Sequence, residues 1–181
     1  MIAEKDIKIF PMFPSPLWVI QREAVKGALE WAINLKDKDK SPHRPYSNVG
    51  GYQSEVQPME NCKYKDHLMS GLSFLPKFSI LGWWINVNKK GDYNVSHCHP
   101  ESDLAAIWYL THSLGCLAFS SPFQMTRSML NPSNDQRIHS PAGSMLVFPS
   151  DIMHRVDAHR EDTPRVSLSF NIRLEEPMNM K

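Results

Sequence analysis

Residues 165–173 read Arg165-Val166-Ser167-Leu168-Ser169-Phe170-Asn171-Ile172-Arg173, a strict alternation of polar and apolar side chains. Successive side chains of a β-strand point to opposite faces, so this stretch predicts a strand with one apolar face and one polar face. An ordinary half-buried strand turns its polar face to water. A strand at the mouth of a barrel would turn Arg165 and Ser167 into a cavity, where the guanidinium could hold a carboxylate through two hydrogen bonds. The residues alone leave both interpretations open.

Short strand-like runs precede this stretch through the C-terminal half of the chain. From Phe78 onward, β-branched and aromatic runs alternate with turn signals such as Gly91-Asp92. The expected strands are Ile80–Val87, Val95–His99, Ala105–Leu110, Cys116–Phe119, Ser144–Phe148 and Arg165–Arg173. Strands of this length and spacing are typical of an all-β sandwich or barrel.

The N-terminal part of the chain has a different pattern. Prolines exclude a helix before residue 17 and allow an edge strand over Leu17–Ile20. Apolar residues recur at helical spacing over Glu23–Leu35 and again over Glu60–Leu72, so we expect two helices there. The intervening stretch, Ser41–Pro58, is rich in Pro, Gly and Asn and is expected to be a loop.

The length of 181 residues suits one domain with a substantial core. We expect a single domain over residues 1–181, in which an extended segment and helices (1–75) pack on a β core (76–175). Residues 128–140, rich in Pro, Ser and Asn, are expected to be a long connection that is either a lid or a passive loop. The edge strand near the N-terminus is a candidate for pairing in a homodimer.

Composition excludes several classes of protein. The chain has 20 Lys+Arg and 19 Asp+Glu, for a formal net charge of +1, which argues against a protein that binds nucleic acid through a basic surface. Three widely spaced cysteines make no disulfide framework and favour a reducing compartment. The N-terminus lacks a signal-peptide pattern, and no apolar run approaches the roughly 20 residues that span a bilayer. We therefore expect a cytoplasmic protein that does not act at a membrane.

Three histidines form the main candidate for chemistry. In His97-Cys98-His99, residues two apart share one face of a strand, so both imidazoles could reach one metal ion. His154 follows a distant strand and a turn and could supply a third ligand. Three ligands on one face leave open positions for substrate and oxygen. A metal beside Arg165 would suit a chelated 2-oxo acid, whereas the alternative is that these are ordinary surface histidines.

A set of motifs in one order extends this pattern over nearly the whole chain. They are Ile9-Phe10-Pro11, Ser15-Pro16-Leu17-Trp18, Ser47–Ser54, Trp84-Ile85-Asn86, Gly91–Pro100, Ile107–Leu110, Pro141–Ser144, Val147–Ser150, His154-Arg155-Val156 and Arg165–Asn171. Their order resembles that of the small 2-oxoglutarate/Fe(II)-dependent oxygenases of bacteria and tailed phages, within the prolyl-hydroxylase-like superfamily. The resemblance implies a mainly β fold, a double-stranded β-helix (jelly-roll, cupin-like) core with N-terminal helices packed on one sheet, and the cofactors Fe(II) and 2-oxoglutarate.

The resemblance also assigns site residues. It implies metal ligands at His97, His99 and His154, and 2-oxoglutarate contacts at Arg165 and Ser167. Asn86 and Tyr109 are expected 2-oxoglutarate contacts because they lie on predicted core strands, with an ordinary structural role as the alternative. Substrate contacts, or support for the ligands, are expected from Asn94, Trp84 and Asn171.

The superfamily's usual triad is His-x-Asp or His-x-Glu with a distant His, so His99 departs from the pattern. A neutral three-His set would hold Fe(II) less tightly and could admit Zn or Ni. Asp103 is the alternative ligand if Pro100 bends the chain, but strand phase favours His99.

The activity implied is that of a dioxygenase, which uses O2 to hydroxylate an unidentified substrate while 2-oxoglutarate is oxidatively decarboxylated to succinate. A peptidyl side chain and a small metabolite are comparable substrates, and a phage-encoded chain would act in the host cytoplasm. Two alternatives remain at this point. One is a cupin-like three-His metalloenzyme that does not use 2-oxoglutarate, and the other is a non-catalytic jelly-roll binding protein.

Overall fold

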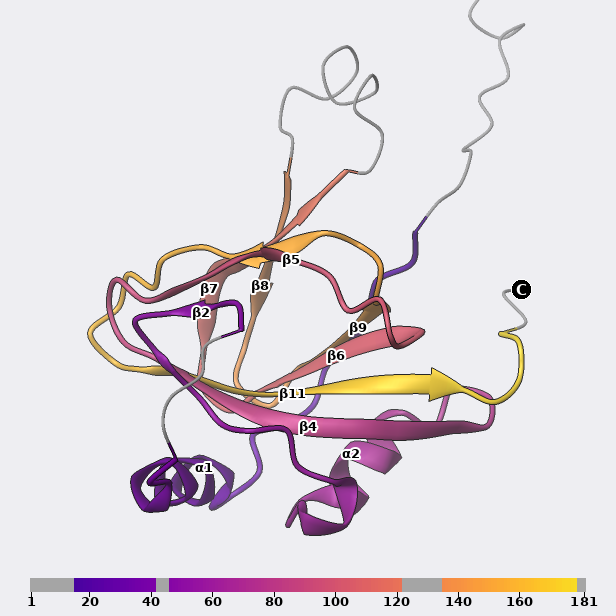
Figure 1. Cartoon of the computed structure of the whole chain (residues 1–181), viewed down its shortest axis with the longest axis horizontal. Helices are drawn as coiled ribbons and strands as arrows, with labels where there is room; N and C mark the ends of the chain where they lie inside the picture. Colours follow the sequence, from indigo (N-terminus) through magenta and orange to yellow (C-terminus); the bar gives the residue numbers. More distant parts are fainter. Residues whose placement is uncertain (1–14, 42–45, 122–134, 179–181) are drawn as a thin grey trace, which may run out of the picture.

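Two antiparallel sheets form the body of the protein, shown in Figure 1 as a computed structural model that describes residues 15–41, 46–121 and 135–178. The six-stranded sheet has the spatial order β1 (Trp18–Ile20), β9 (Met145–Pro149), β6 (Leu104–Tyr109), β11 (Arg165–Leu174), β4 (Phe78–Asn88) and β3 (Tyr52–Gln53). The five-stranded sheet has the order β2 (Asn48–Val49), β5 (Tyr93–His97), β10 (His154–Val156), β7 (Ser113–Ser120) and β8 (Asp135–Ser140). This arrangement is the expected jelly roll.

Strand β11 lies inside the six-stranded sheet and pairs with β4 on one side and β6 on the other. Its apolar side chains from Val166 to Ile172 are fully buried, and the alternate polar side chains Arg165, Ser167, Ser169 and Asn171 line a cavity between the sheets. The pairing with β4 shifts register between Asn171 and Ile172, where Leu81 of β4 is the extra residue. The polar face of residues 165–171 therefore lies in a cavity.

Helices cover the other face of the six-stranded sheet, below β4 and β11 in Figure 1. They are α1 (Ala28–Lys38), the 3-10 helix η2 (Met59–Asn61) and α2 (Lys65–Gly71). Ala32 of α1 and Leu68 of α2 share one core cluster with buried side chains of the sheet, among them Trp83 and Phe170. This large cluster fixes the sheet, and with it every side chain on the opposite, cavity-facing side.

A second, smaller core lies between the two sheets. Leu117 and Phe119 of β7 pack there with Leu146 and Phe148 of β9. This cluster fills part of the space between the sheets, and the cavity occupies another part.

No helix among the described residues has the length and apolarity needed to span a bilayer.

The helices differ from the sequence expectation at their boundaries. The first was expected from Glu23 but begins at Ala28, because Gly27 has a left-handed φ of 80°. The second was expected to run over Glu60–Leu72, but it is divided into η2 and α2 by Cys62, which is extended and buried in the core. Packing of Cys62 against the sheet outweighs the helical periodicity there.

The strands differ in three places. The expected strand Val95–His99 ends at His97 in β5. Residues 135–140, expected as the end of a long connection, form β8, whose Ile138 reaches the inter-sheet cluster; residues 128–134 lie outside the described part of the chain. The expected loop Ser41–Pro58 contains β2 and β3, which are two residues each. Such short strands are defined by their neighbours and give no periodic signal.

Candidate functional site

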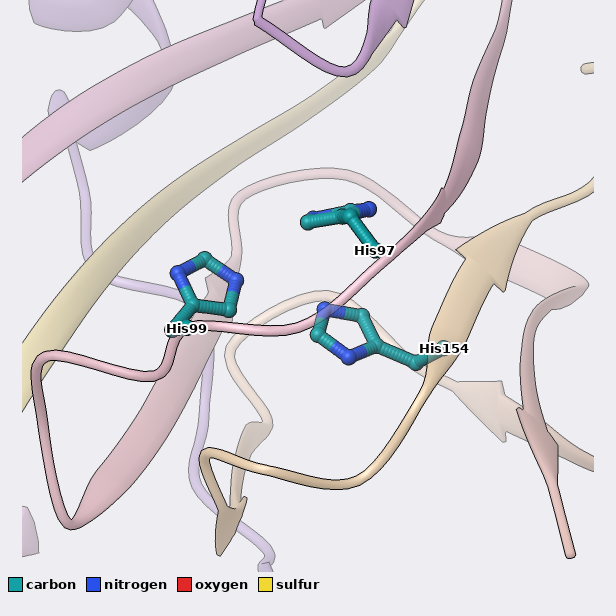
Figure 2. A group of neighbouring side chains, drawn as sticks. All are labelled: His97, His99 and His154. Carbon is teal, nitrogen blue, oxygen red and sulfur yellow. The ribbon is translucent and has the colours of Figure 1, made fainter. Parts of the chain in front are cut away.

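Three imidazoles meet at the edge of the cavity (Figure 2). His97 is the last residue of β5, and His154, the first residue of β10, lies directly opposite it in the antiparallel pair. His99 approaches from the loop that follows β5. One ligand atom from each residue lies within 4.8 Å of the other two, close enough for one metal ion to bind all three. No carboxylate of a described residue joins this group.

Backbone carbonyls orient two of the three rings. His97 Nδ1 lies 2.8 Å from the carbonyl oxygen of Val95, and His154 Nδ1 lies 2.8 Å from that of Ile152. A carbonyl oxygen only accepts, so each Nδ1 carries the proton and donates it. This leaves the Nε2 lone pair of His97 and His154 free, which is the tautomer that binds a metal through Nε2.

Burial keeps the imidazoles neutral. Removal from water, with the nearby His97 adding to it, lowers the pKa of His154 to about 3 and that of His99 to about 4. Burial lowers the pKa of His97 as well. The ring of Phe148 packs edge-on against His154, with centroids 4.9 Å apart. All three rings are therefore in the form that can bind a metal near neutral pH.

The structure brings His99, and not Asp103, to the other two histidines. Asp103 is exposed, and its carboxylate accepts a hydrogen bond from the backbone N–H of Leu174 at 2.8 Å. The expected reason for preferring His99, the phase of a continuing strand, is wrong because β5 ends at His97. A hydrogen bond of 2.7 Å from the His99 backbone N–H to the Ser150 carbonyl holds the loop instead.

The histidines open on a cavity of about 720 Å³ between the two sheets. Apart from Asp103, every other site residue expected from the sequence lines it: Asn86, Tyr109, Arg165 and Ser167 as expected 2-oxoglutarate contacts, and Trp84, Asn94 and Asn171 as expected substrate contacts. The volume lies in the range of small-molecule sites, roughly 300–1,000 Å³.

Arg165 is the most unusual residue in this cavity. Its side chain is 3% exposed, and its buried Nη1 has no hydrogen-bond partner among the described residues. No carboxylate of a described residue forms an ion pair with it. A buried guanidinium without an anion is costly, so the site is suited to an anionic ligand.

Two of the predicted asparagines are held by serines. Asn86 Nδ2 donates to Ser169 Oγ at 3.2 Å, and its Oδ1 is buried without a partner among the described residues. Asn94 Nδ2 donates to Ser47 Oγ at 3.1 Å, which ties β5 to the segment before β2. Asn86 thus keeps a free oxygen in the cavity, while the Asn94 amide also joins two chain segments.

Among the cavity residues that were not singled out from the sequence are three buried polar side chains, Asn88, Gln53 and Ser169. Asn88 is fully buried, lies opposite Arg165 in the β4–β11 pair, and has no partner for either amide atom among the described residues. It follows Asn86 by two residues on the same strand face, and Ser169 belongs to the polar face of β11, so period-two spacing could have found both. Gln53 lies in the two-residue β3 and left no such signal.

Comparisons with known proteins agree with this geometry. The family model described as "Putative 2OG-Fe(II) oxygenase" matches residues 82–171, which contain the three histidines and Arg165, and this confirms the resemblance seen in the sequence. No curated protein sequence matches the chain.

Solved structures share the fold at low identity. The non-haem α-ketoglutarate-dependent epimerase SnoN of nogalamycin biosynthesis is 13% identical with a TM-score of 0.65, over 88% of this chain and 78% of that one. HygX from Streptomyces hygroscopicus, solved with nickel, 2-oxoglutarate and hygromycin B, is 10% identical with a TM-score of 0.63, over 89% and 84%. A Pseudomonas putida prolyl-4-hydroxylase is 13% identical with a TM-score of 0.59, over 88% and 93%.

Proposed function

We propose that this chain, which matches the 2OG-Fe(II) oxygenase family over residues 82–171, is a dioxygenase that hydroxylates its substrate while 2-oxoglutarate is decarboxylated to succinate. One observation carries the proposal. A single cavity contains three neutral imidazoles that can share a metal and a buried guanidinium that lacks an anion. These are the two anchors that a metal-chelating oxo acid with a second carboxylate requires.

The histidines would hold Fe(II), with Nε2 as the donor atom of His97 and His154. The Val95 and Ile152 carbonyls fix these two rings before any metal arrives, so little ordering remains for binding. Bound iron and 2-oxoglutarate supply the oxidising chemistry, which is activation of O2 coupled to loss of CO2 from the oxo acid. The three ligands are uncharged, so the oxo acid would bring the negative charge to the metal.

Arg165 would bind the far carboxylate of 2-oxoglutarate through two hydrogen bonds. Ser167 lies two residues along the same strand face, and Tyr109 lies opposite Ser167 on β6, so each could add a hydroxyl contact to the oxo acid. Phe148, which lines the cavity, packs against His154 with Phe119 behind it, and this apolar contact would help to keep water from the reacting centre.

The substrate does not follow from the fold. HygX was solved with hygromycin B, and the Pseudomonas putida protein is a prolyl-4-hydroxylase, so similar jelly rolls act on unlike molecules. For this chain we propose O2 and either a peptidyl side chain or a small metabolite as co-substrates, taken up in the cavity.

The test is an anaerobic titration of the purified protein with Fe(II) and then 2-oxoglutarate. A weak visible charge-transfer band should appear, and His97→Ala and His154→Ala should abolish it. Arg165→Ala should weaken 2-oxoglutarate binding far more than iron binding. A band that survives both histidine substitutions would refute the ligand assignment.

The neutral three-His set also favours a second candidate, a cupin-like metalloenzyme that binds iron without 2-oxoglutarate. The same titration separates the two, because this candidate predicts that 2-oxoglutarate leaves the spectrum of the iron-loaded protein unchanged. A jelly-roll protein without catalytic function would retain no divalent metal at all.

A further inference from the structure

The part of the cavity beside the metal centre has its own surface, distinct from the Arg165 end. Trp84 stacks on His99, with ring centroids 5.7 Å apart and an angle of 23° between the planes. Asn171 lies opposite Gly82 across the β4–β11 pair, and Gly82 precedes Trp84 by two residues on the same strand face. Trp84 and Asn171 therefore flank the position where a substrate would lie next to His99.

Val56 completes this surface from the edge of the sheet. Its Cγ1 occupies the space that a side chain at Gly82 would need, so Val56 packs directly over the glycine. Val56 lines the cavity and is 54% exposed, although valine is usually buried. An indole face and an exposed valine side by side offer an apolar contact to a carbon group of a ligand.

Several acceptor oxygens in the cavity lack a hydrogen-bond donor in the described part of the chain. Asn171 Oδ1, Asn86 Oδ1 and Gln53 Oε1 are all buried without a partner among the described residues. All three side chains line the cavity. Buried acceptors left without donors are costly, so a ligand that brings N–H or O–H groups would satisfy them.

The charged residues of the cavity lining narrow the range of possible substrates further. Arg165 is the only lysine or arginine among the described residues that line the cavity, and the proposed function assigns it to 2-oxoglutarate. No second cation of the described lining remains for an anionic substrate. Glu101, the one acidic side chain of that lining, is exposed to water, which screens its charge.

We propose that Val56, Trp84 and Asn171 form the substrate subsite, and that it selects an uncharged molecule with an apolar carbon group next to a hydrogen-bond donor such as an amide N–H. The carbon group lies on Trp84 and Val56, and the donor faces Asn171 Oδ1. This inference rests on the proposed function only in assigning Arg165 to 2-oxoglutarate and a metal to the three histidines.

Three matched probes test the charge and donor preference. They are N-acetyl-leucinamide, which is neutral, N-acetyl-leucine, which is an anion, and leucinamide, which is a cation. Each is titrated by ligand-observed NMR into the protein loaded with Ni(II) and 2-oxoglutarate, which holds the site without turnover. The neutral amide should bind at least about fivefold more tightly than the anion. This is the difference in affinity expected when the amide gains one net hydrogen bond and the anion finds no cation to pair with.

Two substitutions at Asn171 place the effect at the proposed subsite. Asn171→Leu should weaken the neutral probe about fivefold, and Asn171→Asp should reverse the order of the neutral and cationic probes. Asn34→Asp, the same chemical change at an exposed position of α1, should change none of the three affinities.

The outcomes separate this inference from the proposed function. Failure of 2-oxoglutarate to bind the Ni(II)-loaded protein refutes the proposed function, and with it the role assigned to Arg165. The proposed subsite is overturned if 2-oxoglutarate binds normally but the protein shows no preference among the probes or binds none of them. It is also overturned if Asn171→Asp leaves the selectivity unchanged.

Discussion

The two faces of the six-stranded sheet are built from the same strands but in opposite ways. On the helix face, Leu168 and Phe170 are completely buried against α1, α2 and their neighbours, and apolar contacts satisfy them. On the cavity face, Arg165 and Asn88 are equally buried but retain polar atoms without partners among the described residues. One face stabilises the protein, while the other keeps unmet hydrogen-bonding capacity for ligands, which costs stability.

The largest expected effect on stability comes from a substitution on the helix face. Phe170→Ala removes a buried ring from the core cluster and should lower the free energy of unfolding by about 3–5 kcal/mol. Ser169→Ala, at the neighbouring position on the cavity face, should lower it by only about 1 kcal/mol, because it removes one hydrogen-bond acceptor, that of the Asn86 amide. Urea denaturation of the metal-free proteins measures both, and equal losses would contradict the division between the faces.

The second prediction concerns the cavity face. Arg165→Met keeps the length of the side chain and removes the charge, so 2-oxoglutarate affinity should fall by about 3 kcal/mol, roughly a hundredfold. The metal-free variant should be as stable as the parent or more stable, because an unpaired buried charge is gone. Calorimetric titration measures the 2-oxoglutarate affinity, and urea denaturation measures the free energy of unfolding. A large loss of stability would show that Arg165 has a structural role.

The third prediction asks which side chain completes the metal site. His99→Asp adds a negative charge to the ligand set and should raise Fe(II) affinity about tenfold, the size of roughly 1.4 kcal/mol. Asp103→Asn serves as the control and should leave Fe(II) affinity unchanged, because Asp103 bonds to the Leu174 backbone outside the cavity. Weaker iron binding in Asp103→Asn would make Asp103 the ligand instead.

The smallest expected effect lies on the five-stranded sheet, at the ion pair between Asp135 and Arg155. A hydrogen bond from Arg155 lowers the pKa of Asp135 below its ordinary value of 3.8. A lowered carboxyl pKa contributes stability above 3.8, and this contribution is lost as the pH falls through the lower pKa of the folded state. Asp135→Asn should therefore cost about 1 kcal/mol at pH 7 and progressively less as the pH falls below 3.8.

A matched control is available in Asp162, which pairs with Lys90 at 2.8 Å but is 91% exposed. Asp162→Asn should change stability very little at either pH, because water screens this pair. A pH-independent loss in Asp135→Asn would mean that shape and not charge explains the role of Asp135.

The sequence predicted the parts of the fold that carry regular periodicity. The alternation over residues 165–173 predicted both faces of β11 and put Arg165 on the polar face, but it left open whether that face meets water or a cavity. The order of His97, His99 and His154 made a common metal site one of two interpretations, and the structure brings the three side chains together. The alternation of β11 is a local signal, because it depends only on which way side chains point along one strand.

Features that depend on distant pairing were not predictable. The two residues of β3 are a strand only because β4 lies beside them, so Gln53 was missed as a cavity residue. His99 reaches the site through a loop, which is held by the hydrogen bond from the His99 backbone N–H to the Ser150 carbonyl. These two residues are 51 positions apart, so the direction of side chains along one strand could not predict this contact. Tertiary hydrogen bonds, and not local propensity, decide these positions.

The place of β11 in the six-stranded sheet has a consequence for synthesis on the ribosome. β11 is the last described strand in chain order, yet it lies between β4 and β6, so each of these strands has an unpaired edge until residues 165–174 emerge. The pairing of β11 with β4 joins residues 77 or more positions apart, which makes it a slow, late step of folding. The nascent chain thus holds open strand edges while the residues between β4 and β11 are made, and chaperones that shield such edges would raise the yield of folded protein.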